Sequence, residues 1–188
     1  TYDAETEHAF ALKCFSCSHL IHRAEEYCPN CGAGTDKDVF DEKELSRLAV
    51  FVESALEKLN FNPVLARAGN EYWLFHYGSS EIRIFVFKRD YLYAVSPLNE
   101  LPVEKLEAFY TFVLSDPIPP FKLGVSASNQ LFISYRIHIS DIFVDEAAGN
   151  SVAEHIKKLA ETADRLDDEL VDTYGCKMTV FAKKELKR

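Results

Sequence analysis

Apolar residues recur at a helical spacing in three stretches of the 188-residue chain. A period of about 3.6 residues is typical of helices that bury one face. The predicted helices cover residues 41–59, 103–114 and 151–173. Asp41 is the expected N-cap of the first helix, Pro102 lies in the first turn of the second, and Gly175 is a natural C-terminal cap for the third.

Short runs rich in aromatic and β-branched residues lie between these helices and predict β-strands. The expected strands cover residues 64–68, 71–77, 81–88, 91–95, 122–127 and 130–140, and a short strand over 178–181 is a further option. Turn-forming residues separate neighbouring runs, and Gly78-Ser79-Ser80 has the composition of a hairpin turn. The prolines within residues 116–121 exclude a helix there.

This order of elements predicts an α+β fold, in which helices pack on one face of an antiparallel sheet. The first 35 residues differ from the rest because they hold few apolar residues, and so short a segment rarely folds without a crosslink or a metal. We therefore expect a small module over residues 1–35 and an α+β domain over residues 36–188.

A simple hairpin closed by residues 78–80 places alternate residues of its two strands on opposite faces. One face is almost wholly apolar and is expected to pack beneath the helices. Its residues are Trp73, Phe75, Tyr77, Ile82, Ile84 and Val86. The other face mixes aromatic and basic residues, which protein interfaces prefer, and is predicted to hold a subunit or a peptide. The candidate contact residues are Tyr72, His76, Arg83, Phe85 and Phe87. Alternatively, the C-terminal tail covers this face.

The chain is acidic, with a formal net charge of -9 and a pI of about 5.2. An acidic chain is repelled by nucleic-acid backbones and by anionic lipid surfaces, so neither is an expected partner. No apolar run approaches the ~20 residues of a membrane span, and no signal peptide is evident. Four cysteines at metal-binding spacing and the odd Cys176 indicate a reducing compartment, and we expect the protein to be cytoplasmic.

Four of the five cysteines form two C-x-x-C pairs, separated by ten residues. The four are Cys14, Cys17, Cys28 and Cys31. Two such turns can present four thiolates at the corners of a tetrahedron, which suits Zn²⁺ better than iron. Four sulfur ligands leave no open position for substrate, so the predicted role of the metal is structural. A redox dithiol and a pair of disulfides are the alternative interpretations. Phe15, Leu20, Ile21 and Tyr27 are the expected apolar cover of this module.

The cysteine pattern with its Cys28-Pro-Asn-Cys-Gly32 turn resembles a zinc ribbon. The following domain resembles the bacterial sensory-transduction-regulator (YbjN-like) family. The resemblance lies in EYWLFHYGSSEIRIFVF, LPVEKLEAFYTFVL, QLFISYRIHIS and a long acidic last helix, within residues 40–175. It implies the fold of type III secretion chaperones and a non-enzymatic, often dimeric domain that binds a protein partner. The N-terminal ribbon departs from secretion chaperones, which favours an adaptor role.

Sequence motifs for catalysis are missing: there is no phosphate-binding G-x-x-x-x-G-K-[ST] or G-x-G-x-x-G and no G-x-S-x-G. Cys176 shows no neighbouring base, and residues 164–169 are expected to form an exposed helix face. We therefore predict a protein that is not an enzyme and acts as an adaptor, regulator or chaperone, with a homodimer as an expected assembly. The alternative is a nucleic-acid-associated regulator that uses the ribbon. Its candidate contacts are Lys13, His19, His22 and Arg23.

Overall fold

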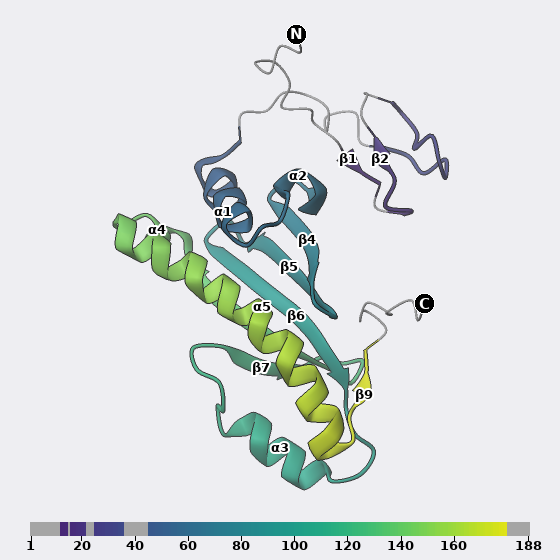
Figure 1. The fold of residues 1–188 in the computed structure, drawn as a ribbon, viewed down its shortest axis with the longest axis vertical. Coiled ribbons are helices and arrows are strands. Elements are labelled where there is room, and N and C mark those ends of the chain that lie inside the picture. The colour runs from purple at the N-terminus through teal and green to yellow at the C-terminus, as the bar shows by residue number, and fades with distance from the viewer. Residues whose placement is uncertain (1–11, 15, 22–24, 36–44, 180–188) are drawn as a thin grey trace. The chain divides into compact units, whose positions relative to one another are not determined.

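Figure 1 shows the fold of the chain in a computed structural model. The structure describes residues 12–14, 16–21, 25–35 and 45–179. The chain forms two compact units, residues 1–73 and residues 74–188, and each is described here by itself. The domain boundary expected after residue 35 stays a prediction.

In its described residues, the first unit contains a small two-stranded sheet, two helices and the beginning of a second sheet. Its elements are β1 (Leu12–Lys13), β2 (Leu20–Ile21), α1 (Arg47–Lys58), α2 (Pro63–Ala66), β3 (Arg67–Gly69) and the first two residues of β4 (Tyr72–Tyr77). Strand β1 pairs with β2, and β3 pairs with the start of β4, both in antiparallel fashion.

Helix α1 begins at Arg47, later than the sequence pattern predicted. Ser46 is its N-cap, because the Ser46 Oγ accepts a hydrogen bond from the Ala49 N–H at 3.1 Å. The expected cap, Asp41, lies outside the described residues. The helix ends at Lys58, close to the predicted end. Its inward face is apolar except for Glu53, and the apolar part consists of Leu48, Ala49, Val52, Ala55 and Leu56.

A short helix, α2, replaces part of the strand predicted over residues 64–68. Pro63 occupies its first turn, where the missing N–H of proline costs no hydrogen bond. The Asn62 Oδ1 accepts a hydrogen bond from the Val64 N–H at 3.0 Å and caps the turn. These local signals outweigh the run of apolar residues that suggested a strand.

Glu53 is buried on α1 and is held by two side chains from the neighbouring strands of the first unit. The Arg67 guanidinium donates to both carboxylate oxygens, with the Nη2–Oε2 distance at 2.6 Å. The Trp73 Nε1–H donates to the same carboxylate at 3.2 Å. A buried carboxylate with these partners fixes α1 against β3 and the start of β4, because losing any partner would leave a desolvated charge.

The second unit is built on a β-sheet. Its strands are the remainder of β4, β5 (Ser80–Phe87), β6 (Tyr91–Glu100), β7 (Lys122–Val125), β8 (Gln130–His138) and β9 (Lys177–Met178). Their order is β4-β5-β6-β8-β7, and β9 pairs with the end of β6. Strand β6 pairs with β5, β8 and β9, and β7 pairs with β8, each in antiparallel fashion. Strand β6 continues beyond the predicted residue 95, and its register with β8 shifts after Pro97, which lacks an N–H for the ladder.

The described residues of the second unit, 74–179, form three helices: α3 (Leu106–Leu114), α4 (Ile139–Ile142) and α5 (Glu146–Tyr174). Figure 1 shows the long α5 running along one face of the sheet, where it contacts β5, β6 and β8. Its buried stripe is Val152, Ile156, Leu159, Ala160, Ala163, Leu166, Asp167 and Leu170. The predicted α+β fold, with helices packed on an antiparallel sheet, is confirmed.

The beginnings of these helices differ from the predictions, and local hydrogen bonds or backbone conformations account for each difference. Helix α3 begins at Leu106 rather than next to Pro102, after Lys105 in a left-handed conformation with φ 58°. Residues 139 and 140 belong to α4 rather than to β8, because the His138 Nδ1 accepts from the Ser140 N–H. Helix α5 begins earlier than expected because Asp145 caps the Ala148 N–H at 2.7 Å, and it ends as predicted at Gly175, with φ 72°.

The hairpin turn between β4 and β5 is bound to α5 by two aspartates. Gly78 has φ 56°, as the turn predicted from its sequence requires. The Ser79 N–H donates to Asp164 Oδ1 at 2.8 Å, and the Ser79 hydroxyl lies 3.1 Å from a carboxylate oxygen of both Asp164 and Asp167. The expectation that residues 164–169 form an exposed helix face is therefore wrong in part, since Asp167 is only 2% exposed.

Burial raises the pKa of Asp167 above its ordinary value of 3.8, and repulsion from Asp168 and Asp164 acts in the same direction. Hydrogen bonds from Ser79 and from the Asp168 N–H oppose the shift. Burial thus disfavours the ionised form of Asp167, and the hydrogen bond from Ser79 in the hairpin turn offsets part of that cost.

Candidate functional site

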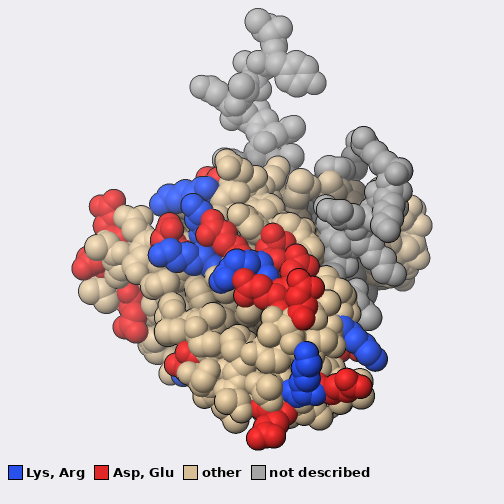
Figure 2. Space-filling view, turned by 60° about the horizontal axis from the view of Figure 1, so that its bottom comes forward, with Lys and Arg blue, Asp and Glu red and all other residues tan. Residues whose placement is uncertain are grey.

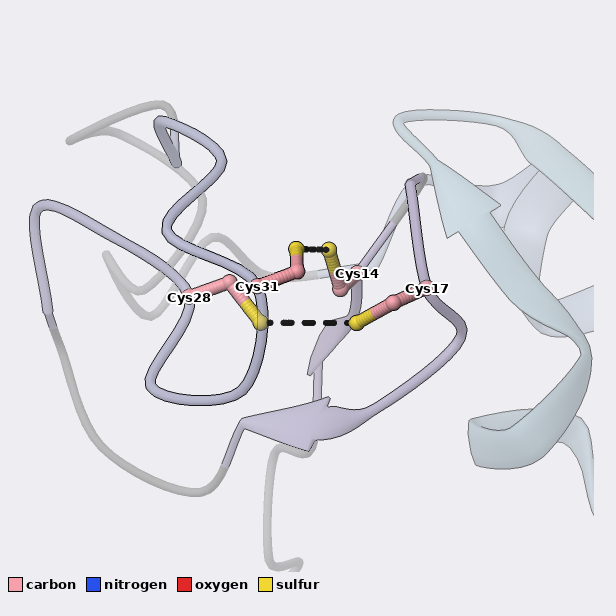
Figure 3. Close-up of side chains that lie close together, drawn as sticks. All are labelled: Cys14, Cys17, Cys28 and Cys31. Carbon is pink, nitrogen blue, oxygen red and sulfur yellow. Dashed lines mark hydrogen bonds between the residues drawn. The ribbon is translucent and has the colours of Figure 1, made fainter.

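The four cysteines of the two C-x-x-C pairs converge, as the spacing predicted (Figure 3). Their sulfur atoms all lie within 4.8 Å of one another. The Sγ atoms of Cys14 and Cys31 are 3.6 Å apart, and those of Cys17 and Cys28 are 3.7 Å apart. Each of these pairs joins one C-x-x-C turn to the other.

These distances fit a tetrahedral metal site. With a Zn–S bond of about 2.3 Å, tetrahedral geometry places the ligand sulfurs about 3.8 Å from each other. A disulfide would need about 2.05 Å, and all four cysteines are free. The four thiols could therefore hold a metal ion, and the donor set leaves it no open position for a substrate.

The two cysteine turns have the same backbone hydrogen bonds. In the first, the Cys14 N–H donates to the His19 carbonyl at 2.8 Å and the Ser18 N–H donates to the Cys14 carbonyl at 2.9 Å. In the second, the Cys28 N–H donates to the Ala33 carbonyl at 2.7 Å and the Gly32 N–H to the Cys28 carbonyl at 2.9 Å. The two turns therefore have the same backbone arrangement around their pair of cysteines.

The equivalent residues after each second cysteine are both left-handed. Gly32 has φ 72° and Ser18 has φ 61°. A residue with a side chain adopts this conformation at a cost in free energy, so the left-handed backbone is less favourable at Ser18 than at Gly32.

Hydrogen bonding separates the acidities of two of the thiols. The Asn30 side chain and then the His19 N–H lower the pKa of Cys17 from 9.0 to about 6. At Cys31 the Ala33 N–H acts in the same sense, but hydrogen bonds with the other thiols and desolvation outweigh it and raise the pKa to about 11. Deprotonating one sulfur therefore makes it harder to deprotonate another nearby.

The apolar interior around the sulfurs is small. Cys14, Ile21 and Cys28 are buried together, and Cys17 and Ala33 pack against them. Tyr27 is 63% exposed and does not provide the expected cover, while Phe15 lies outside the described residues. Within the described residues of this segment, the buried apolar groups are few.

The hairpin faces have the predicted alternation. Trp73 and Phe75 on β4 and Ile82 and Ile84 on β5 are buried, whereas Tyr77 and Val86 are half-buried. Among the candidate partner-binding residues, His76, Arg83 and Phe85 are half-buried and Phe87 is 44% exposed in the second unit. Tyr72, also half-buried, starts β4 in the first unit. That these residues bind a partner stays a prediction, and so does the alternative that the C-terminal tail covers them, because residues 180–188 lie outside the described part of the chain.

Glu81 lies on the same face and was missed by sequence reasoning. It is buried, and its carboxylate accepts a hydrogen bond from the Arg83 Nε at 2.6 Å. The His76 Nε2 is 4.0 Å from the other carboxylate oxygen. Much of the positive charge expected from Arg83 is therefore neutralised within the sheet.

The strand register adds aromatic and basic residues to this face. Tyr93 of β6 lies opposite Phe85 of β5 and Arg136 of β8. Tyr91 lies opposite Phe87 and His138. We call the surface made by Phe85, Phe87, Tyr91, Tyr93, Arg136 and His138 the aromatic face. Alternation along β6 and β8 signals this surface in the sequence, but assembling it requires the pairing of β6 with β8.

Charged side chains of both signs are mixed on the face that Figure 2 shows. Figure 2 shows one side of the molecule, on which Lys and Arg side chains lie beside Asp and Glu. Along α5 the Lys157 Nζ is 4.0 Å from Glu161, and Arg165 is 2.8 Å from Glu169. None of the helices in the described part of the chain combines the length and apolarity needed to cross a bilayer.

Of the residues expected to contact nucleic acid in the alternative interpretation, His22 and Arg23 lie outside the described residues. His19 is exposed.

Comparison with known proteins finds no matching family model and no matching curated protein. Solved structures similar to this chain include a chain of the heterodimeric complex ExoU–SpcU from the type III secretion system of Pseudomonas aeruginosa. It has a TM-score of 0.47 and 15% identity over 65% of this chain and 99% of that chain. Another belongs to the Yersinia pestis type III secretion chaperone SycH in complex with a fragment of YscM2, with a TM-score of 0.40 and 9% identity over 59% and 98% of the two chains. A chain of the HopA1–SchA chaperone–effector complex has a TM-score of 0.39 and 10% identity over 63% and 99%. Each likeness is distant, and none assigns a function to this chain.

Proposed function

We propose that this protein is a non-enzymatic adaptor or chaperone-like regulator that binds a protein partner through the aromatic face of its sheet. In this proposal a YbjN-like domain carries the binding face, and a zinc ribbon precedes it. The observation that carries the proposal is the contrast between the two sheet faces of the second unit.

One sheet face is covered by α5, whose apolar stripe is buried against it. The opposite face presents aromatic rings at the sheet surface, and Phe87 remains 44% exposed. A contiguous surface of rings with Arg nearby is the composition that distinguishes protein interfaces from the rest of a protein surface. Large aromatic side chains and Arg also account for most of the binding energy where partners meet.

The zinc ion of this proposal would be held by Cys14, Cys17, Cys28 and Cys31. Bound there, it would supply folding energy to a segment whose buried interior is small. The reduced state that the four thiols need supports a cytoplasmic location, as does Cys176, a fifth thiol that is buried by itself.

Helix α3 supports a homodimer. Leu106, Tyr110 and Leu114 recur on one side of the helix and are 41%, 40% and 82% exposed. Nearby Val103 is 75% exposed. An apolar helix stripe of this kind is stabilised when it packs against a second copy. Light scattering should give the mass of a dimer for the native chain and of a monomer for Leu114→Glu; a native monomer would contradict this part of the proposal.

The binding proposal is tested by capture from the native cell. Tagged wild-type protein, Phe87→Glu and Val144→Glu are compared by quantitative mass spectrometry of crosslinked complexes. Val144 is the matched control because it is an exposed apolar residue, 72% exposed, outside the sheet. We expect one protein to be enriched with the wild type and with the control, and to be lost with Phe87→Glu. Equal recovery by both variants would place partner binding elsewhere.

A further inference from the structure

Two basic side chains, Lys88 and Arg136, lie over rings of the aromatic face, which attract them without cancelling their positive charge. The Arg136 guanidinium lies 5.2 Å from the centre of the Tyr91 ring, and its Nη1 lies 3.5 Å from the Tyr93 hydroxyl. The Lys88 Nζ lies 5.3 Å from the centre of the Phe87 ring. A cation over a ring is attracted to it yet keeps its net charge.

Arg83 on the same sheet differs from Arg136. Its Nε is bonded to the Glu81 carboxylate at 2.6 Å, so the charge of that pair is largely cancelled. The positive charge of this side of the sheet is therefore concentrated at the end where β5 turns into β6, over Lys88 and Arg136.

The rings beneath these cations contact one another in two groups, Phe85–Tyr93–Phe87 and Tyr91–His138. Phe85 and Tyr93 are stacked, with ring centres 5.6 Å apart and planes 8° apart. Phe87 meets Tyr93 edge to face at 5.7 Å, and Tyr91 meets His138 in the same way at 5.2 Å. Rings held by one another lose little freedom when a partner binds, which favours affinity.

We propose that the aromatic face binds an extended peptide segment of a protein partner in which an acidic side chain adjoins aromatic or aliphatic residues. The inference rests on the proposed function and names the chemistry of the partner. The acidic group pairs with the Arg136 guanidinium, whose planar fork suits a carboxylate. The neighbouring apolar side chains lie on the rings of Phe85, Phe87 and Tyr93.

Charge distinguishes a peptide from a nucleic acid as the occupant. A single strand of nucleic acid brings a phosphate with every nucleotide and needs a basic groove along its length. Arg136 and Lys88 can neutralise one or two negative groups, whereas the chain as a whole has a net charge of -9. An acidic peptide needs no more than these two cations, so the observed charges fit it better.

The test uses defined probes and fluorescence anisotropy. Labelled random poly(Glu,Tyr) supplies acidic and aromatic groups together, poly(Glu) supplies the charge alone, and oligo(dT) of 20 nucleotides is the nucleic-acid probe. We expect poly(Glu,Tyr) to bind at least tenfold more tightly than the other two, and its binding to weaken as salt rises. Tighter binding of oligo(dT), or no preference for poly(Glu,Tyr), would overturn the inference.

Arg136→Gln is the decisive variant, and Arg165→Gln is its matched control. Arg165 is an exposed arginine on α5, paired with Glu169. We expect Arg136→Gln to weaken poly(Glu,Tyr) binding about tenfold, Arg136→Lys to recover part of the loss, and Arg165→Gln to have no effect. Equal affinities for the two glutamine variants would refute the assignment of Arg136.

The same variants separate this inference from the proposed function. If Phe87→Glu abolishes capture of the cellular partner while Arg136→Gln leaves it unchanged, the sheet face binds a protein but the acidic partner chemistry is wrong. If neither variant changes capture, the proposed function fails as well.

Discussion

Replacing Gly78 with alanine should destabilise the second unit by about 2.5–5 kcal/mol, for two separable reasons. Gly78 has φ 56°, a conformation that costs an L-residue with a side chain about 1–2 kcal/mol. A Cβ at this position would also lie 2.0 Å from Asp164 Oδ1 and 2.3 Å from its Cγ. The Asp164 carboxylate must therefore move away.

Moving Asp164 removes one of the two aspartates that attach the turn to α5, while the contact of Ser79 with Asp167 remains. The carboxylate accepts the Ser79 N–H at 2.8 Å and faces the Ser79 hydroxyl at 3.1 Å. A hydrogen bond to a charged acceptor is worth about 1.5–3 kcal/mol, and the Ser79 N–H loses its partner as well. Adding this loss to the backbone cost gives the predicted total.

The assay is urea unfolding followed by circular dichroism, and its controls isolate each term. Gly175 has φ 72°, and a Cβ added there would meet no atom within 4 Å apart from its chain neighbours, so Gly175→Ala should cost only the backbone term of about 1–2 kcal/mol. In an Asp164→Ala background the collision is gone, and Gly78→Ala should cost no more than Gly175→Ala. If Gly78→Ala costs the same with and without Asp164, the close approach of the carboxylate plays no part and the reasoning is refuted.

Three other predictions concern the metal and the buried aspartate. Native mass spectrometry should find one zinc ion per chain, lost in Cys28→Ser but retained in Cys176→Ser; retention in both would rule out the four-thiol site. Ser18→Gly should raise the apparent zinc affinity about fivefold, and Gly32→Ala should lower it by a similar factor, because metal binding and local folding are coupled and each change alters the left-handed backbone cost by ~1 kcal/mol. The folded-state pKa of Asp167 lies above its unfolded value, so the folded state binds its proton first and the wild type should gain unfolding free energy relative to Asp167→Asn as pH falls through the raised pKa towards 3.8. Parallel stability curves for the two proteins over that range would contradict the assigned burial of the charge.

The sequence predicted the elements whose signals are local and repeated. The apolar stripe of α5, the alternation along β4 and β5, and the Gly78 turn all depend on neighbours a few residues apart. The cysteine cluster was predictable for a similar reason, since two short turns of fixed spacing specify where four sulfurs point.

The features that escaped prediction depend on partners distant in the chain or on competing local signals. The sequence around Asp164 and Asp167 predicted an exposed acidic helix face. Their partner Ser79 lies 85 residues before Asp164, so the local sequence carried no sign of the contact. The strand predicted at residue 64 is a helical turn, because Pro63 and the Asn62 cap decide the backbone there. The residues of β6 and β8 that extend the aromatic face follow from strand order, which alternation alone does not give.

The strand β9 has a consequence for how the protein is handled. It pairs with β6 at Asn99 and Glu100, and next to it the Thr179 hydroxyl donates to Gln130 Oε1 at 3.1 Å. Shortening the chain before Lys177 would uncover these backbone groups and leave a bare sheet edge, on which another strand can add. Variants truncated before Lys177 should therefore aggregate more readily than the longer chain. An affinity tag should be placed after β9 and should not replace it.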